Sequence, residues 1–500
     1  MPAGQPGMTP EAALADAASR LTWGDLPPEV VTAIRRLFID WLGSALGGSG
    51  SEQAQRLAAA LAAGGLVTGG HGDPGRGGGT ASALPPLALA PPLVAALLNG
   101  ASGHVLEMDD LHNDSIYHPG TCVFPAALAV AEALGASPRA FLTAAVAGYE
   151  VSLRVGEALG PEHYRFFHTT GTAGTFGAAV AAGHLLGLDA RAMLSALGSA
   201  GTQAAGLWQF LADGTMSKQL HTAKAAFNGA LSAYLASEQF SGTSAVLLGE
   251  KALLRATASS GAAAGDEALR ERQRERLLAG LEPGAASDDA SARFAVFKTP
   301  RVSLKFHASC RHTHPAVDAL LLLLRTHDLG PADIAAVHAR VNSAAFDLLN
   351  GVEPSSPWAA KFSLPFCLAQ AALHGGLPVD SFRESALAQP EVVDLMSRVT
   401  LEADRSLDRE YPRRWAASVE VETTSGETLE ARVDSPKGDP ENPLSEDELS
   451  DKFRALAALR LDPGRVDTLW DRLQALEALP SMGLLLGETV ATQPGGVTPP

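Results

Sequence analysis

Apolar residues between residues 9 and 256 recur at three- and four-residue intervals, and glycine and proline interrupt the pattern. Such spacing places apolar side chains on one face of a helix. The runs VVTAIRRLFIDWLGSALGG and SPRAFLTAAVAGYEVSLRVGEAL are each long enough for three or more helical turns. We therefore predict that residues 8–256 form the first part of a large all-helical domain.

The pattern changes after residue 256. Residues 257–293 are charged and rich in glycine and alanine, which is typical of a solvated helix with flexible flanks, and we expect them to link two domains. Further on, IAAVHARVNS alternates with a period of two, and SVEVETTSGETLEARVDS reads as two strands joined by a Ser-Gly turn. Residues 294–440 are thus predicted to form a smaller α+β domain.

Helical spacing returns after Pro443, in LSEDELSDKFRALAALR and RVDTLWDRLQALEAL. Ser445 and Glu448 have the spacing of a capping box, in which each side chain accepts a hydrogen bond from the other's backbone. We expect residues 441–487 to pack back on the first domain and residues 488–500 to be a disordered tail. The predicted fold class is mainly α, with an all-helical domain completed by the C-terminal helices and a smaller α+β domain.

Charge and cysteine content narrow the function. The formal net charge is −17, which argues against a nucleic-acid or anionic-membrane surface because both require concentrated lysine and arginine. The three cysteines have no CxxC spacing. There is no basic N-terminal region followed by an apolar core, and four prolines interrupt the longest apolar stretch, residues 81–98. We therefore expect a cytoplasmic protein that binds neither membrane nor nucleic acid.

The segment GHVLEMDDLHNDSIYHPGTCVFP, residues 103–125, has the composition of a functional site. It contains three histidines and four acidic residues between two almost purely apolar runs: His104, Glu107, Asp109, Asp110, His112, Asp114 and His118. Titratable groups placed close together at the edge of a core acquire shifted pKa values, and proton-transfer catalysis uses such shifts. A solvated loop with incidental charge is the alternative.

Two further clusters lie in the predicted helical domain. His168 precedes a threonine- and glycine-rich helix start, where backbone N–H groups could bind a carboxylate, although the glycines are also explained by close helix packing. Lys218, His221 and Lys224 share one face if their segment is helical. A solvated basic face and a functional site are equally consistent with that spacing.

The α+β domain contains a cluster in VSLKFHASCRHTHPAVDAL. Six titratable or cationic residues of this segment fall within ten positions: Lys305, His307, Cys310, Arg311, His312 and His314. This clustering suggests a metal site or a set of general acids and bases with cationic anchors. No HExxH or paired CxxC gives a recognised zinc geometry, so we predict no metal.

Taken together, these stretches resemble the MmgE/PrpD family, whose members include 2-methylcitrate dehydratase, cis-aconitate decarboxylase and an epimerase of iminodisuccinate. The resemblance covers most of the chain. It rests on six motifs in the family's order and spacing: HVLEMDDLHNDSIYHPG, AGYEVSLRVGEAL, FFHTTGTAGTFGAA, MSKQLHTAKAAFNG, LKFHASCRHTHPAVDA and AAKFSLPF. It implies that the α+β domain is a lid, that the protein is a homodimer, and that the site lies between the domains without an obligatory metal or cofactor.

The resemblance also implies roles for individual residues. His118, His168, Lys218 and Lys305 fall where family members place catalytic or carboxylate-binding side chains. Seven further residues are expected to bind the substrate: Glu107, Asp109, His112, His221, Cys310, Arg311 and His314. Three positions depart from the family pattern. Tricarboxylate-acting members usually have aspartate at the position of Glu107 and have histidine at the position of Cys310. The decarboxylase has threonine at the position of Leu111.

The expected reaction is proton abstraction beside a carboxylate, with dehydration of a hydroxylated di- or tricarboxylic acid as in 2-methylcitrate dehydratase. Lysine and arginine would stabilise the enediolate, and the histidines would act as base and acid. Decarboxylation and epimerisation of a related acid are alternatives. So are a metal-dependent hydrolase built on His112, His118, Asp109 and Asp110, and a helical scaffold without catalytic activity.

Overall fold

The computed structural model describes residues 8–66, 80–84, 87–213, 215–257, 266–283 and 292–486, so the predicted tail 488–500 lies outside the described residues. The chain divides into two compact units. Unit 1 comprises Met1–Val105, Ser115–Arg301 and Leu449–Pro500, and unit 2 comprises Leu106–Asp114 and Val302–Glu448. No helix in the described ranges is both long enough and apolar enough to cross a bilayer.

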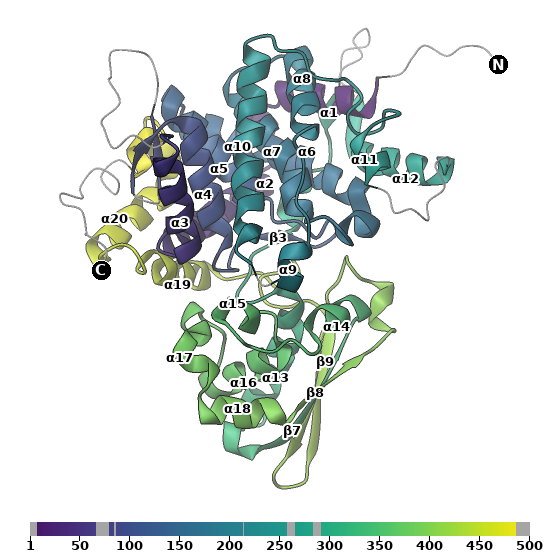
Figure 1. The fold of residues 1–500 in the computed structure, drawn as a ribbon, viewed down its shortest axis with the longest axis vertical. Helices are drawn as coiled ribbons and strands as arrows, with labels where there is room; N and C mark the ends of the chain where they lie inside the picture. The colour runs from purple at the N-terminus through teal and green to yellow at the C-terminus, as the bar shows by residue number, and fades with distance from the viewer. Residues whose placement is uncertain are drawn as a thin grey trace. The chain divides into compact units, whose positions relative to one another are not determined.

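Unit 1 is built mainly from α-helices (Figure 1). Their bounds are α1 Pro10–Arg20, α2 Pro28–Gly48, α3 Glu52–Ala63, α4 Pro92–His104, α5 Gly120–Leu134, α6 Pro138–Tyr164, α7 Thr169–Leu185, α8 Ala190–Gly201, α9 Gln209–Asp213, α10 Ser217–Ser237, α11 Leu253–Ala256, α12 Glu267–Leu278 and α20 Pro463–Gln474. Two short antiparallel pairs accompany them: β1 (Ala81–Ala83) with β2 (Ala88–Ala90), and β4 (Leu281–Pro283) with β5 (Ala292–Phe294). The mainly helical fold predicted from the periodicity is confirmed.

Helix α7 is central to unit 1 and packs against α5, α6 and α10. Small residues allow this close approach. A Cβ at Gly174 would lie 2.4 Å from the Cys122 sulfur on α5, and one at Gly177 would lie 2.7 Å from the Ser152 hydroxyl on α6. Because both distances are shorter than any ordinary contact, the glycines of this segment serve helix packing.

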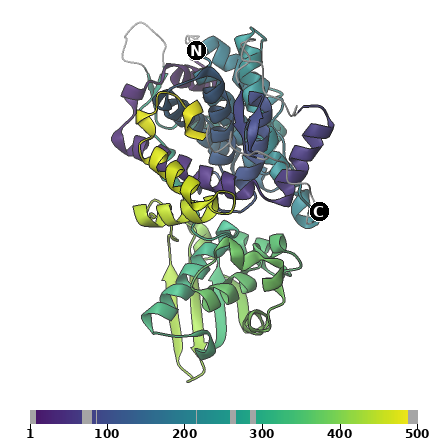
Figure 2. The same ribbon diagram turned by 90° about the vertical axis from the view of Figure 1, so that its left-hand side faces the viewer.

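The C-terminal helices belong largely to unit 1, as predicted. Helix α19 (Glu446–Ala457) begins with the expected capping box: the Ser445 N–H donates to Glu448 at 2.7 Å, and the Glu448 N–H donates to the Ser445 hydroxyl at 3.1 Å. Lys452 of α19 forms a buried ion pair with Asp40 of α2. Figure 2 shows α19 and α20 in yellow beside the purple N-terminal helices.

Unit 2 contains a four-stranded sheet in the order β10-β9-β7-β8. The strands are β7 Ile334–Val341, β8 Val399–Ala403, β9 Ala417–Thr423 and β10 Thr428–Val433, and β7 and β8 form the parallel pair. The helices are α13 His314–Thr326, α14 Ser343–Leu349, α15 Pro357–Ala360, α16 Leu364–His374, α17 Glu384–Leu387 and α18 Pro390–Ser397. Helix α13 packs on β9 and β10, and α16 packs on α13. The predicted α+β character and the hairpin of β9 and β10 are confirmed.

The boundaries of the units differ from the predicted ones in two places. Residues 106–114, expected in the helical domain, belong to unit 2 because β3 (Leu111–His112) pairs with β6 (Val302–Ser303). The expected linker contains α12, which packs on α6 and belongs to unit 1. Residues 298–301 also remain in unit 1, since the Lys298 and Thr299 N–H groups donate to the Glu150 carboxylate of α6 at 2.8–2.9 Å.

Candidate functional site

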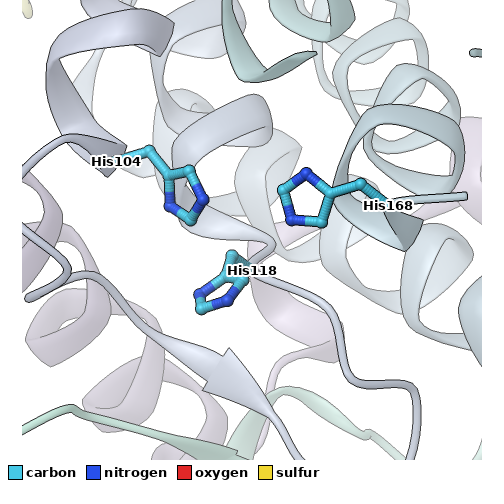
Figure 3. Close-up of side chains that lie close together, drawn as sticks. All are labelled: His104, His118 and His168. Atoms are coloured by element: carbon cyan, nitrogen blue, oxygen red, sulfur yellow. The ribbon is translucent and has the colours of Figure 1, made fainter. Parts of the chain in front are cut away.

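Three histidines from separate segments of unit 1 turn their rings toward one another (Figure 3). His104 ends α4, His118 lies just before α5, and His168 is the N-cap of α7. The ring centroids lie 4.7 Å apart for His104 and His118, 5.6 Å for His104 and His168, and 6.3 Å for His118 and His168. His104 and His168 are buried, whereas His118 is half-buried.

Backbone contacts hold this cluster in place. The His168 N–H donates to the Gly206 carbonyl at 2.9 Å, beside an isolated bridge between Phe167 and Leu207. The His118 N–H donates to the Thr170 hydroxyl at 3.3 Å, which ties the loop before α5 to the start of α7. These bonds fix where the rings emerge from their segments, so the site is preorganised by the helical frame of unit 1.

Helix α10 contributes Lys218 and His221 to the same region. Lys218 is 3% exposed, and the His221 Nδ1 lies 3.3 Å from the His168 Nδ1. Gly206 has a φ of 147°, and a Cβ there would lie 3.1 Å from the His221 ring. Glycine therefore permits the backbone turn that brings His168 and His221 together.

Two imidazoles of this region, those of His168 and His221, are held in the neutral state. Burial lowers the pKa of His168 well below its ordinary value, and the nearby charges of His104, Lys218, His221 and His118 lower it further. Burial also lowers the pKa of His221 to about 4, assisted by Lys224, His104 and Lys218. Both imidazoles can thus accept a proton at neutral pH but are difficult to keep protonated.

Aromatic rings form one wall of the cluster. The Trp208 ring lies 4.8 Å from the His168 ring and 5.4 Å from Phe210, and Phe210 lies 5.3 Å from His221. The Trp208 indole nitrogen is buried and has no hydrogen-bond partner in the part of the chain that the structure describes. Sequence reasoning missed both aromatics, because neither lies in a recognisable motif.

In unit 2, Lys305 and Glu107 form a buried ion pair with a separation of 3.1 Å. Glu107 has a φ of 58°, an uncommon backbone conformation for a residue other than glycine. The Lys361 ammonium donates to the carbonyls of Leu106 at 2.9 Å and Ala308 at 2.5 Å, which joins the segments on either side of this pair. Lys361, the lysine of the AAKFSLPF motif, therefore helps to position Glu107 near Lys305.

Arg311 also has a carboxylate partner. Its guanidinium forms a buried ion pair with Asp439, which in addition accepts bonds from the Ser303 hydroxyl at 2.5 Å and the Asn113 amide at 3.1 Å. The Arg311 Nη1 lies 3.2 Å from the His314 Nδ1, and burial, followed by the Arg311 charge, lowers the pKa of His314. No local sequence signal marks Asp439, so its pairing with Arg311 was not predicted.

Cys310 lies beside a second buried histidine of unit 2. Its sulfur is 3.6 Å from the His312 Nδ1, and the His312 Nε2 is 3.1 Å from the Tyr411 hydroxyl. Burial lowers the pKa of His312 to about 3, with Arg311 adding to the effect. His312 is therefore neutral at physiological pH and serves as a hydrogen-bonding neighbour of the thiol.

The expected site residues divide between the two units. His118, His168, Lys218 and His221 lie in unit 1, where the structure brings them together with His104. The rest lie in unit 2: Glu107, Asp109, His112, Lys305, Cys310, Arg311 and His314. Asp109 and His112 are buried, and His112 is part of β3. That these residues act on a substrate stays a prediction.

His104, His118 and His168 each place one nitrogen within 4.8 Å of the others, a spacing that a divalent ion could bridge. The Lys218 ammonium lies nearby, and its charge helps to lower the pKa of His168. It would therefore repel a metal cation bound by the three histidines. The hydrolase alternative groups His118 with Asp109 and Asp110. Among the described residues, however, the group of possible metal ligands that contains His118 consists of His104, His118 and His168.

Comparison with known proteins identifies the family. The MmgE/PrpD N-terminal domain matches residues 12–264, and the MmgE/PrpD C-terminal domain matches residues 307–477. The chain belongs to the MmgE/PrpD family. The resemblance drawn from the six motifs is confirmed.

Curated relatives of this MmgE/PrpD chain include cis-aconitate decarboxylases. The Aspergillus terreus protein is 27% identical over 419 residues, covering 79% of this chain and 80% of the relative. The human protein is 28% identical over 413 residues and covers 79% of each chain. The cis-aconitate decarboxylase-like protein oryM of Aspergillus oryzae is 27% identical over 501 residues, covering 96% of this chain and 97% of the relative.

Proposed function

We propose that this protein is a lyase that acts on a small polycarboxylic acid without a metal or organic cofactor, and that decarboxylation of a cis-aconitate-like acid is its reaction. The observation that carries the proposal is the group of histidines beside Lys218 in unit 1. The neutral His168 imidazole and the buried Lys218 ammonium supply a proton-transfer group and the positive charge that such a reaction needs. The decarboxylases among the relatives favour this reaction over the dehydration expected from the sequence.

Decarboxylation breaks the bond between a carbon and its carboxylate, and carbon dioxide leaves. The electron pair stays on the substrate, where conjugation with a remaining carboxylate or double bond delocalises it, and a proton then adds to carbon. In this proposal Lys218 holds the carboxylate that gains charge. His118 gives the proton, because it is the more exposed ring of the cluster and can be reprotonated from solvent.

Dehydration of a hydroxylated acid remains the second candidate, and the neutral state of His168 favours it. A neutral imidazole can remove the proton beside the carboxylate, while another histidine protonates the departing hydroxyl group. Lys305 would provide a second positive charge in either reaction.

Product analysis separates these reactions. Purified protein is incubated with cis-aconitate, 2-methylcitrate or citrate, and carbon dioxide release and proton NMR spectra are recorded. We expect carbon dioxide and a monodecarboxylated product from cis-aconitate, whereas loss of a hydroxyl group without carbon dioxide would establish the dehydratase instead.

Two controls complete the test. The Lys305→Met variant should lose turnover while remaining folded, and full activity of that variant would overturn the role of unit 2. Activity should survive treatment with a chelator. Loss of activity on chelation, with recovery on adding one equivalent of a metal, would overturn the metal-free proposal and support a metal-dependent enzyme.

A further inference from the structure

Lys224 is a half-buried lysine of unit 1 that the proposed reaction does not use. It lies on α10, six residues after Lys218 and three after His221. Its ammonium nitrogen is buried and has no hydrogen-bond partner in the described ranges. A buried polar group without a partner is costly, so water, an ion or a ligand usually completes such a group.

The neighbours of Lys224 belong to the candidate site. Its charge is the largest influence, after burial, on the lowered pKa of His221, whose ring also lies near His104 and Lys218. On the other side, Cys122 of α5 is the neighbouring group whose charge, if the thiol were ionised, would raise the pKa of Lys224. The Cys122 thiol donates to the Thr170 carbonyl at 3.4 Å, so it is a protonated donor and supplies no negative charge to Lys224.

Burial lowers the pKa of Lys224 to about 8. Most of the amine is therefore still protonated at pH 7, although the protein environment disfavours the charge. An anion beside it would offset this cost, and the attraction between the two charges would be stronger in the low-dielectric interior than in water.

We propose that Lys224 binds a second carboxylate of the substrate, so that α10 presents one ammonium group on each side of His221. Lys218 and Lys224 are separated by about 9 Å along the helix axis, and His221 lies between them both in sequence and around the helix. The substrate of this site accordingly carries at least two carboxylates, one for each lysine. This inference rests on the proposed function and adds the residue that selects a polycarboxylate over a monocarboxylate.

Binding can be measured without turnover by using tricarballylate, a saturated tricarboxylate. It has no double bond to delocalise the electron pair that decarboxylation would leave on the substrate. Isothermal titration calorimetry compares the wild-type protein with Lys224→Met, which keeps most of the length of the side chain and removes its charge. The exposed Lys251 supplies the matched control variant, Lys251→Met. We expect Lys224→Met to weaken tricarballylate binding about 10- to 100-fold, the loss typical of one charge-assisted hydrogen bond, and Lys251→Met to leave it unchanged.

Proton uptake gives a second readout that a purely structural lysine would not produce. At pH 8 about half of the Lys224 amines are deprotonated in the free protein, and a bound carboxylate raises their pKa, so binding should take up about half a proton. His221, with a pKa of about 4, is far from titrating at this pH. Titrations in two buffers of different ionisation enthalpy measure the uptake, which should vanish in Lys224→Met.

The outcomes separate this inference from the proposed function. Equal affinity and equal proton uptake in wild type and Lys224→Met would overturn the role of Lys224 while leaving the lyase proposal standing. Binding of acetate as tight as that of tricarballylate would also overturn it. If the wild-type protein bound no polycarboxylate, both proposals would fail.

Discussion

Replacing Lys218 by methionine tests the candidate site directly, because methionine keeps an unbranched apolar stem and removes the charge. If Lys218 stabilises charge that develops on a carboxylate, its loss should lower kcat about 10²- to 10³-fold, by analogy with removal of one oxyanion donor. That factor corresponds to about 2.7–4 kcal/mol of transition-state stabilisation. A steady-state assay on the acid that the wild-type protein converts measures it, with Lys251→Met as the control.

Folding should be affected much less than catalysis. Lys218 is the second residue of α10 and is 3% exposed, so its charge lies buried at the positive end of a helix dipole. Both features disfavour a cation, and the dipole contributes about 0.3–1 kcal/mol. The free energy of unfolding of Lys218→Met, measured by urea titration, should therefore lie within about 1 kcal/mol of the wild-type value.

The pH profile supplies an independent check. The charge of Lys218 helps to lower the pKa of both His168 and His221. Removing it should raise both pKa values and move the acid limb of kcat/KM toward higher pH. Near-full turnover with an unchanged acid limb would refute the assignment of Lys218 to the site.

Three further outcomes are expected. Stability should fall as the pH drops from about 6.5 toward 3, because His312 binds a proton in the unfolded chain but not in the folded protein, where its pKa is about 3; the contribution is on the order of 5 kcal/mol, and urea titrations of His312→Phe should show a flatter pH dependence. Lys452→Met should lower the free energy of unfolding by about 3–5 kcal/mol, since it removes the charge that pairs with buried Asp40, and the added Asp40→Asn change should restore part of it. Gly177→Ala should reduce the melting temperature through a clash with Ser152, equivalent to about 1–3 kcal/mol, and an unchanged value would contradict the packing argument.

Local patterns in the sequence were sufficient for most of the fold. The three- and four-residue spacing predicted α2 and α6, and the alternation around residues 334–341 predicted β7. Ser445 and Glu448 predicted the start of α19 because a capping box depends on residues only three positions apart. Each of these signals lies within one element, where chain geometry alone links pattern to structure.

The pairing of β3 with β6 could not be predicted in this way. Only two residues of each strand take part, and they are separated by about 190 positions in the sequence. A two-residue strand has no periodicity to detect. Residues 106–114 were therefore assigned to the helical domain that surrounds them in the sequence, although their hydrogen bonds place them in unit 2.

The same distinction applies to the candidate site. The sequence identified cations by residue type, but it could not show which of them already have a carboxylate partner, since Glu107 precedes Lys305 by 198 positions and Asp439 follows Arg311 by 128.

The structure separates these cations into two kinds. Lys305 and Arg311 form ion pairs with protein carboxylates, so a substrate carboxylate must displace the protein carboxylate or join an existing pair. The cost of desolvating these two cations is already offset within the folded protein. The Lys224 ammonium has no hydrogen-bond partner among the described residues, so a carboxylate that reaches it meets an uncompensated charge. Recognition of a polycarboxylate should therefore depend more strongly on α10 than on the cation-rich segment of unit 2 that dominates the sequence.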